Sequence, residues 1–203
     1  MPDNEIKRRL DAWFDELMRA LDRKTVFVNQ SDDPVFYLVY PPRWALSVYS
    51  MLPEWKAKLR HRNWTPREFN VGLEILNYLK GHADRDVIVA YEKENPDAVG
   101  DVTESLRDLL RKADGSIVVE DWILDEIESS RTESRGVLIL TGIELLHPLL
   151  QIGNIEQRLQ GKFSVPGIVC YPGERTSSFG LRYLGIYDPD GTYRSRHFGG
   201  RRV

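Results

Sequence analysis

Two short apolar runs and the segment between them dominate the hydrophobic pattern of the chain. Residues 137–140 (Val-Leu-Ile-Leu) and residues 167–171 (Gly-Ile-Val-Cys-Tyr) flank residues 143–159, whose apolar side chains recur at helical spacing. Apolar runs of this length are typical of parallel strands buried on both faces, and a helix is the usual crossover between two such strands. The pattern therefore predicts an α/β fold with a mostly parallel sheet.

The remaining pattern adds strands and helices around this centre. Helical spacing predicts a helix over residues 4–21, and the β-branched and aromatic run at 35–40 predicts a strand that ends at Pro41 and Pro42. A short strand is predicted over residues 68–71. Helical spacing predicts a helix over residues 44–62, with a new turn or a kink at Pro53. It predicts further helices over residues 73–80 and 86–94, from residue 102 to the Gly115 that ends it, and over 118–129.

The end of the chain has the pattern of a β-hairpin. A turn-forming sequence at residues 188–191 (Asp-Pro-Asp-Gly) separates two segments with strand character, 178–186 and 192–198. A chain of 203 residues can bury a sizeable core, so residues 1–203 are predicted to form a single α/β domain. The helices at about 83–135 form an insertion in that domain.

Charge is spread unevenly although the total is nearly balanced, with a formal net charge of -3 at pH 7. Residues 83–135 contain fifteen acidic and seven basic side chains, whereas residues 172–203 contain three acidic side chains and six arginines. This makes the helical insertion acidic. The overall balance does not indicate a nucleic-acid-binding protein.

The single cysteine and the hydropathy pattern bear on the compartment. Cys170 has no partner for an internal disulfide and lies in an apolar run, which favours a packing role in a reduced compartment. No run reaches the roughly 18 to 20 apolar residues that span a bilayer, and the charged start of the chain is followed by no secretory core. These features predict a cytoplasmic protein without membrane contact.

The usual motifs of nucleotide chemistry are missing. The sequence has neither the Gly-x4-Gly-Lys-Ser/Thr motif of P-loop proteins nor the GxGxxG motif of Rossmann domains. Pro41 and Pro42 follow the first strand and lack the N–H groups that a phosphate-binding loop uses. Thr141 and Gly142 stand where ATPases carry a metal-positioning aspartate. We therefore predict no nucleotide cofactor.

Metal and hydrolase motifs are also missing. The four histidines, His61, His82, His147 and His197, are scattered without an HExxH motif or a cysteine pair, so no metal site is predicted. No GxSxG motif occurs, and Cys170 has no activating neighbours in sequence. A buried structural thiol is the favoured interpretation.

The C-terminal arginines alternate with aromatic residues, as they can on nucleic-acid-binding strands. Arg194 and Arg196 lie in this stretch, with Arg201 and Arg202 beyond it. A half-buried strand with arginines on its wet face is the favoured alternative, because no wider basic region supports DNA binding. Contact with DNA is predicted at most within a larger complex.

Residues Tyr171, Pro172 and Gly173 end the second central apolar run. Proline interrupts a strand ladder, and glycine tolerates a positive φ. We therefore predict a rigid turn at this strand end, with a positive φ at Gly173.

Several blocks of the sequence resemble one protein family. These blocks are residues 36–42, 138–142 with 147–150, and 165–173, followed by Leu181-Arg182 and Tyr193-Arg194. Together they resemble the BrxB family of bacteriophage-exclusion (BREX) defence systems. After Tyr171-Pro172-Gly173 the family continues toward Tyr-Asp-Gly-Gln, whereas this chain has Glu174-Arg175-Thr176-Ser177. A role for this loop is therefore not transferred.

The resemblance implies a three-layer α/β fold, related to P-loop or Rossmann domains that have lost their phosphate loop. It also implies a non-catalytic accessory subunit that works beside a PglZ-type protein and other BREX components. The surface for such partners is expected on the acidic insertion or on the exposed side of the helix at 44–62.

An enzyme is the alternative from a different functional class. A nucleotide-dependent or nucleic-acid-processing enzyme would use an unfamiliar set of residues, for which Glu144, His147, Glu174 and Arg182 are the candidates. With Arg194 and Arg196 these four residues are also the candidate binding residues.

Overall fold

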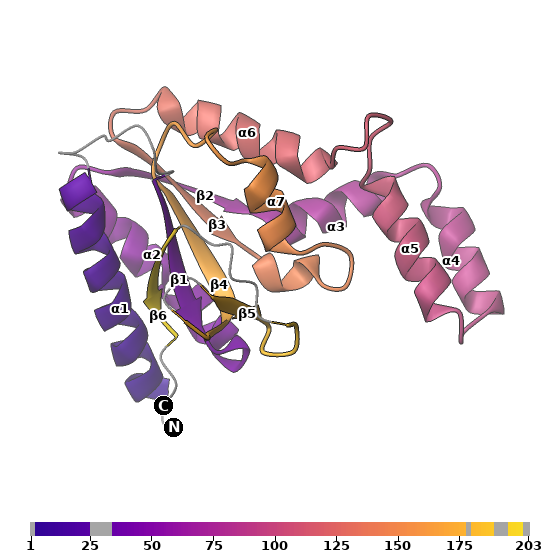
Figure 1. Ribbon diagram of the computed structural model, residues 1–203, viewed down its shortest axis with the longest axis horizontal. Coiled ribbons are helices and arrows are strands. Elements are labelled where there is room, and N and C mark those ends of the chain that lie inside the picture. Colours follow the sequence, from indigo (N-terminus) through magenta and orange to yellow (C-terminus); the bar gives the residue numbers. More distant parts are fainter. Residues whose placement is uncertain (1–2, 25–33, 178–179, 189–194, 201–203) are drawn as a thin grey trace.

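The computed structural model describes residues 3–24, 34–177, 180–188 and 195–200. Within these ranges the chain forms a six-stranded sheet with helices on both faces (Figure 1). Five strands are parallel in the order β2-β3-β4-β1-β6, and β5 pairs with β4 in the antiparallel direction. The strands are β1 (Val35–Tyr40), β2 (Thr65–Asn70), β3 (Gly136–Thr141), β4 (Gly167–Arg175), β5 (Leu181–Tyr183) and β6 (Arg196–Gly199). The predicted α/β fold with a mostly parallel sheet is confirmed.

The helices divide into two layers and a projecting pair. They are α1 (Asp3–Lys24), α2 (Ala45–His61), α3 (Val71–Gly81), α4 (Arg85–Glu94), α5 (Val99–Leu109), α6 (Val118–Arg131) and α7 (Ile152–Arg158), with the short 3-10 helices η1 (Pro42–Trp44) and η2 (Ile143–Leu146). Of these described helices, none combines the length and the apolar character needed to cross a membrane.

Alternate residues of the central strands enter two separate cores. In β1, Phe36 and Leu38 pack with the apolar faces of α1 and α2, whereas Tyr37 and Val39 pack with those of α6 and α7. Successive strand residues point to opposite faces, so a strand covered on both sides must be apolar throughout. All six residues of β1 are accordingly buried. This arrangement is the predicted three-layer sandwich.

The order of the strands bears on the likeness to nucleotide-binding domains. It differs from the 3-2-1-4-5-6 order of Rossmann domains. The relation to P-loop domains stays a prediction.

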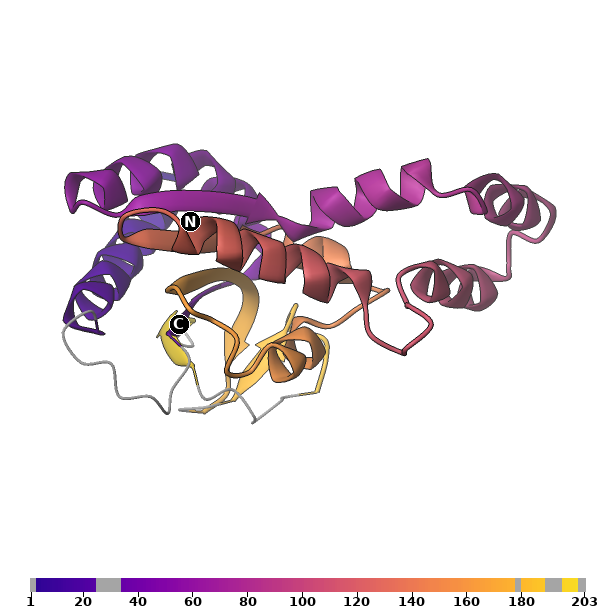
Figure 2. The same cartoon turned by 90° about the horizontal axis from the view of Figure 1, so that it is seen from above.

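Four helices, α3 to α6, lie between β2 and β3, and the last three of them lie within residues 83–135, the predicted insertion. Helix α6 packs on the sheet, whereas α4 and α5 lie side by side and project away from it (Figures 1 and 2). No residue of α4 is buried, and Val102 is the buried residue of α5. We refer to residues 84–109 as the arm.

The predicted C-terminal hairpin is wrong. Strand β5 pairs with the end of β4, opposing Gly173 to Tyr183, and β6 pairs in parallel with β1. The turn signal at 188–191 lies largely outside the described residues, as does most of the segment at 192–195. A turn-forming sequence marks a chain reversal but does not choose the strand partner, and here the apolar Phe198 joins the core beside Phe36.

The predicted helix over 143–159 is also divided. It consists of η2 and α7, and His147 between them is extended with ψ 138°. A residue before proline is sterically disfavoured in the helical conformation, so Pro148 accounts for the break.

Candidate functional site

The carboxyl end of the parallel sheet is the expected position of a binding site, because ligands of open α/β sheets bind there. At the end of β1, Pro42 begins the tight helix η1, and the N–H of Trp44 donates to the Pro41 carbonyl oxygen at 2.8 Å. A phosphate-binding loop presents several free N–H groups to its ligand. Pro41 and Pro42 have none, and Trp44 uses its own within the turn.

The loops after β2 and β3 interlock. Gly142 has a positive φ of 73°, and a Cβ at this position would overlap the Asn70 side chain. Asn70 is opposite Thr141 in the sheet and caps α3 by accepting a hydrogen bond of 2.9 Å from the Leu73 N–H. Only glycine fits at position 142. The sequence interpretation missed Asn70, although an asparagine directly before a helical apolar pattern is a helix-start signal.

Glu144 reaches from η2 to α2. Its Oε1 accepts a hydrogen bond from the Tyr49 hydroxyl. Burial, reinforced by Glu144, raises the pKa of Tyr49, which keeps this hydroxyl protonated as the donor. Glu144 Oε2 and Thr141 Oγ1 are buried and have no hydrogen-bond partner among the described residues.

His147 belongs to a different group of side chains. Its Nδ1 is hydrogen-bonded to the Tyr187 hydroxyl, and the two ring centroids lie 5.6 Å apart. The neighbouring Tyr183 donates a hydrogen bond to the Ile143 carbonyl oxygen, so β5 is tied to η2. The sequence interpretation did not identify either tyrosine.

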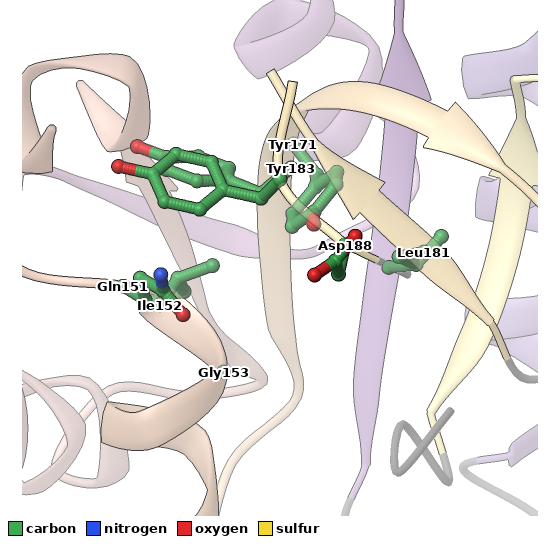
Figure 3. Close-up of a pocket in the computed structure, with 8 residues that line it drawn as sticks. Gln151, Ile152, Gly153, Tyr171, Leu181, Tyr183 and Asp188 are labelled. Atoms are coloured by element: carbon green, nitrogen blue, oxygen red, sulfur yellow. The ribbon is translucent and has the colours of Figure 1, made fainter. Parts of the chain in front are cut away.

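A small cavity lies beside these tyrosines (Figure 3). Its lining residues come from the start of α7, from β4, and from β5 with the segment after it: Gln151, Ile152, Gly153, Tyr171, Leu181, Tyr183, Tyr187 and Asp188. Its volume of about 20 Å³ has room for about one water molecule. A nucleotide would need a much larger space.

Glu174 and Arg182 form an ion pair with each other. They are directly opposite across β4 and β5, with 3.9 Å between Glu174 Oε2 and Arg182 Nη1. Both side chains are substantially exposed, so the pair resembles a surface salt bridge. The four residues proposed for an enzyme thus fall into three groups. Glu144 is bonded to Tyr49, His147 is bonded to Tyr187, and Glu174 pairs with Arg182.

Of the two candidate arginines near the end of the chain, the structure describes one. Arg196 is exposed on β6, whereas Arg194 lies outside the described residues. Next to Arg196, burial and the nearby Arg175 lower the pKa of His197 to about 4. His197 is therefore uncharged at neutral pH. The described residues contain no group of three His, Cys, Asp or Glu side chains arranged to hold a metal ion.

The predicted turn at residues 171–173 is wrong in its geometry. Pro172 and Gly173 lie within β4, and Gly173 is not among the residues with a positive φ. The backbone of Pro172 faces β5, because its carbonyl oxygen accepts a hydrogen bond from the Leu184 N–H. The register of β3 with β4 ends at Val169, so the missing N–H of Pro172 breaks no bond to β3.

Gly173 is needed for a close approach. A Cβ there would overlap the Arg182 carbonyl oxygen and would lie 2.6 Å from Tyr171 Cε1. The sequence alone gives no sign of this contact, because it depends on the pairing of β5.

Comparison with known proteins gives one match. The family model described as "BREX protein BrxB" matches residues 68–198 of the 203 residues. The matched segment extends from β2 to β6 and includes the arm. No curated protein and no solved structure matches the chain.

Proposed function

Because this chain belongs to the BrxB family, and is therefore a component of a BREX phage-defence system, we propose that it is a non-catalytic adaptor subunit that binds the PglZ-type protein of that system. The adaptor function is carried by a protein surface, and that surface is the arm.

The exposure of the arm is the observation that carries the proposal. Helix α4 has ten residues and buries none of them. Helices this short are marginal in water unless tertiary packing stabilises them. A projecting helix that contributes little to the core is therefore better explained as a surface for a partner.

The charge of the arm indicates the kind of partner that this surface binds. Residues 84–109 contain eight acidic and three basic side chains. Such an excess favours a basic protein surface and speeds its association with the arm. It disfavours direct contact with the phosphates of DNA.

The pairings at the carboxyl end of the sheet support the non-catalytic part of the proposal. Glu174 is paired with Arg182, and Glu144 and His147 are each bonded to a tyrosine. Catalytic acids and bases commonly share one pocket and act on one substrate. Here the candidates are divided among separate partners.

One observation favours the enzyme as a second candidate. Thr141 Oγ1 and Glu144 Oε2 are buried without a hydrogen-bond partner among the described residues, and they lie where α/β folds bind ligands. A ligand at a hundredfold its dissociation constant stabilises a protein by about 2.7 kcal/mol. A thermal-shift titration with nucleotides and divalent metals therefore tests this candidate, and a shift that Glu144→Gln abolishes would support it.

Co-purification tests the adaptor. A tagged chain, expressed with its complete BREX system, is expected to retain the PglZ-type subunit. The retention should fall when the exposed arm acids Glu92, Glu94 and Glu104 are changed together to lysine. Recovery of the chain alone would contradict the proposal, and unchanged recovery with the lysine variant would contradict the choice of surface.

A further inference from the structure

One stripe of α4 combines exposed apolar side chains with flanking acids. Val87 is 70% exposed and Tyr91 is 43% exposed. Residues four apart are neighbours on a helix, so the two side chains form one apolar patch. Asp84, the N-cap residue directly before α4, lies three residues before Val87, and Glu94 lies three residues after Tyr91; both acids are exposed. We call these four residues the arm stripe.

The aromatic side chain of the stripe is held in place. The Tyr91 hydroxyl donates a hydrogen bond of 3.1 Å to Asp101 Oδ2 in the first turn of α5. Val99, two residues earlier, is 68% exposed and extends the apolar surface onto this turn. A side chain fixed before binding loses less conformational entropy when a partner covers it. Tyrosine is also among the residues that contribute most to protein interfaces.

The base of the arm is fixed to the rest of the domain. Arg107 donates hydrogen bonds to the carbonyl oxygens of Leu149 and Pro148, and Tyr78 donates one to the Leu109 carbonyl oxygen. These bonds hold the end of α5 nearest the sheet. The stripe is therefore presented from an anchored support.

We infer that the arm stripe inserts into an apolar groove with a basic rim on a partner protein. An apolar centre with charged ends on one helix face suits recognition of a helix in a groove. The acids at both ends disfavour nucleic acid and anionic lipid surfaces, whereas basic side chains at the ends of a groove would pair with them. The inference rests on the proposed adaptor function and specifies its contact residues and the chemistry of its partner.

The test is a binding titration between the full chain and the purified PglZ-type subunit of its own system. The double variant V87S/Y91A is expected to weaken binding at least about tenfold, the effect of losing one interface anchor. The double variant D84K/E94K should also weaken binding, and more strongly at low salt than at high salt. Helix α4 buries no residue and the Tyr91–Asp101 hydrogen bond that Y91A removes is exposed, so both variants should keep the cooperative thermal unfolding of the domain.

Two matched controls lie away from the arm. I186S removes an apolar side chain that is also 70% exposed, and E16K reverses an exposed acid of α1. Both are expected to bind as the unchanged chain does. If the unchanged chain binds and V87S/Y91A binds equally well, the inference is overturned while the adaptor function stands. Leu46 of α2 is 84% exposed, and loss of binding by L46S alone would instead place the contact on α2 and overturn the inference.

Phage plating on cells that carry the complete system gives a readout independent of the chosen partner. V87S/Y91A should lose protection against phage, whereas I186S should keep it. Full protection by V87S/Y91A overturns the inference, whether or not the PglZ-type subunit binds. Failure of the unchanged chain to bind that subunit is a separate result, and it overturns the proposed function. Self-association of the purified chain that V87S/Y91A abolishes would assign the stripe to a second copy and contradict the basic-rimmed partner.

Discussion

Arg107 and Leu149, 42 residues apart in the sequence, are joined by a hydrogen bond of 2.9 Å from the arginine Nε to the leucine carbonyl oxygen. The same guanidinium donates a second bond of 3.2 Å to the Pro148 carbonyl oxygen. One side chain of α5 thus connects the arm to the loop that follows η2. Since the arm buries little apolar surface, these bonds are important for its orientation.

Replacing Arg107 by alanine should loosen the arm. The two carbonyl oxygens would lose charged donors, which costs about 1 to 3 kcal/mol of local stability. We expect faster amide hydrogen exchange in α4 and α5, with β1 and β4 unchanged. Arg111→Ala is the matched control, because Arg111 pairs with the exposed Asp108 of its own segment. Equal exchange in both variants would contradict the anchoring role.

Replacing Gly173 by valine should destabilise the whole domain. The new side chain would overlap the Arg182 carbonyl oxygen and force β5 away from β4. Overpacking of this kind costs about 1 to 3 kcal/mol, measurable by chemical denaturation. Gly100→Val is the control, since a Cβ at Gly100 meets no atom within 4 Å. If Gly173→Val unfolds at the same denaturant concentration as the control, the close approach is not what requires glycine.

Stability should fall when the pH is lowered through the range where His197 titrates. Burial, reinforced by the nearby Arg175, lowers the pKa of His197 from its ordinary value of 6.5 to about 4 in the folded state. Below pH 6.5 the unfolded chain takes up a proton at His197 that the folded chain resists. The contribution of neutral His197 to the free energy of unfolding is therefore complete above pH 6.5 and is lost as the pH falls toward 4. His197→Gln should lessen the loss of unfolding free energy between pH 7 and pH 4.5. Identical pH profiles would show that His197 is not the titrating group.

The isolated chain should not bind duplex DNA tightly. Residues 172–203 contain six arginines and three acidic side chains, a net charge of only +3, whereas strong salt-dependent binding commonly uses about six to ten phosphate contacts. In an electrophoretic shift assay we expect no complex at sub-micromolar protein. A salt-sensitive complex that is lost when Arg194, Arg196, Arg201 and Arg202 are changed to alanine would contradict this expectation.

The buried strands could be predicted from the sequence because a strand covered on both faces requires a continuous run of apolar residues. The apolar run at 35–40 coincides with β1, and the run at 137–140 lies within β3. The strand predicted over residues 68–71 is β2 at 65–70, which begins three residues earlier and ends one residue earlier. It pairs with β3 at the edge of the sheet and is only partly buried, so it contains Pro66, Arg67 and Glu68 instead of an apolar run.

Contacts that depend on pairing between distant segments could not be predicted. The sequence predicts a positive φ at Gly173, where glycine is needed for another reason, and it does not predict the positive φ that Gly142 has. For Gly173 the reason is the neighbouring strand β5, whose partner the sequence does not reveal. The bonds of Glu144 to Tyr49 and of His147 to Tyr187 likewise join segments that only the folded chain brings together.

The most direct measurement of the adaptor function is a calorimetric titration of the PglZ-type subunit into the full chain at two salt concentrations. We expect saturable binding that weakens as the salt concentration rises, because the arm is acidic and exposed. Absence of binding at both salt concentrations, together with stabilisation of the chain by a nucleotide or metal, would contradict the adaptor function and favour the enzyme.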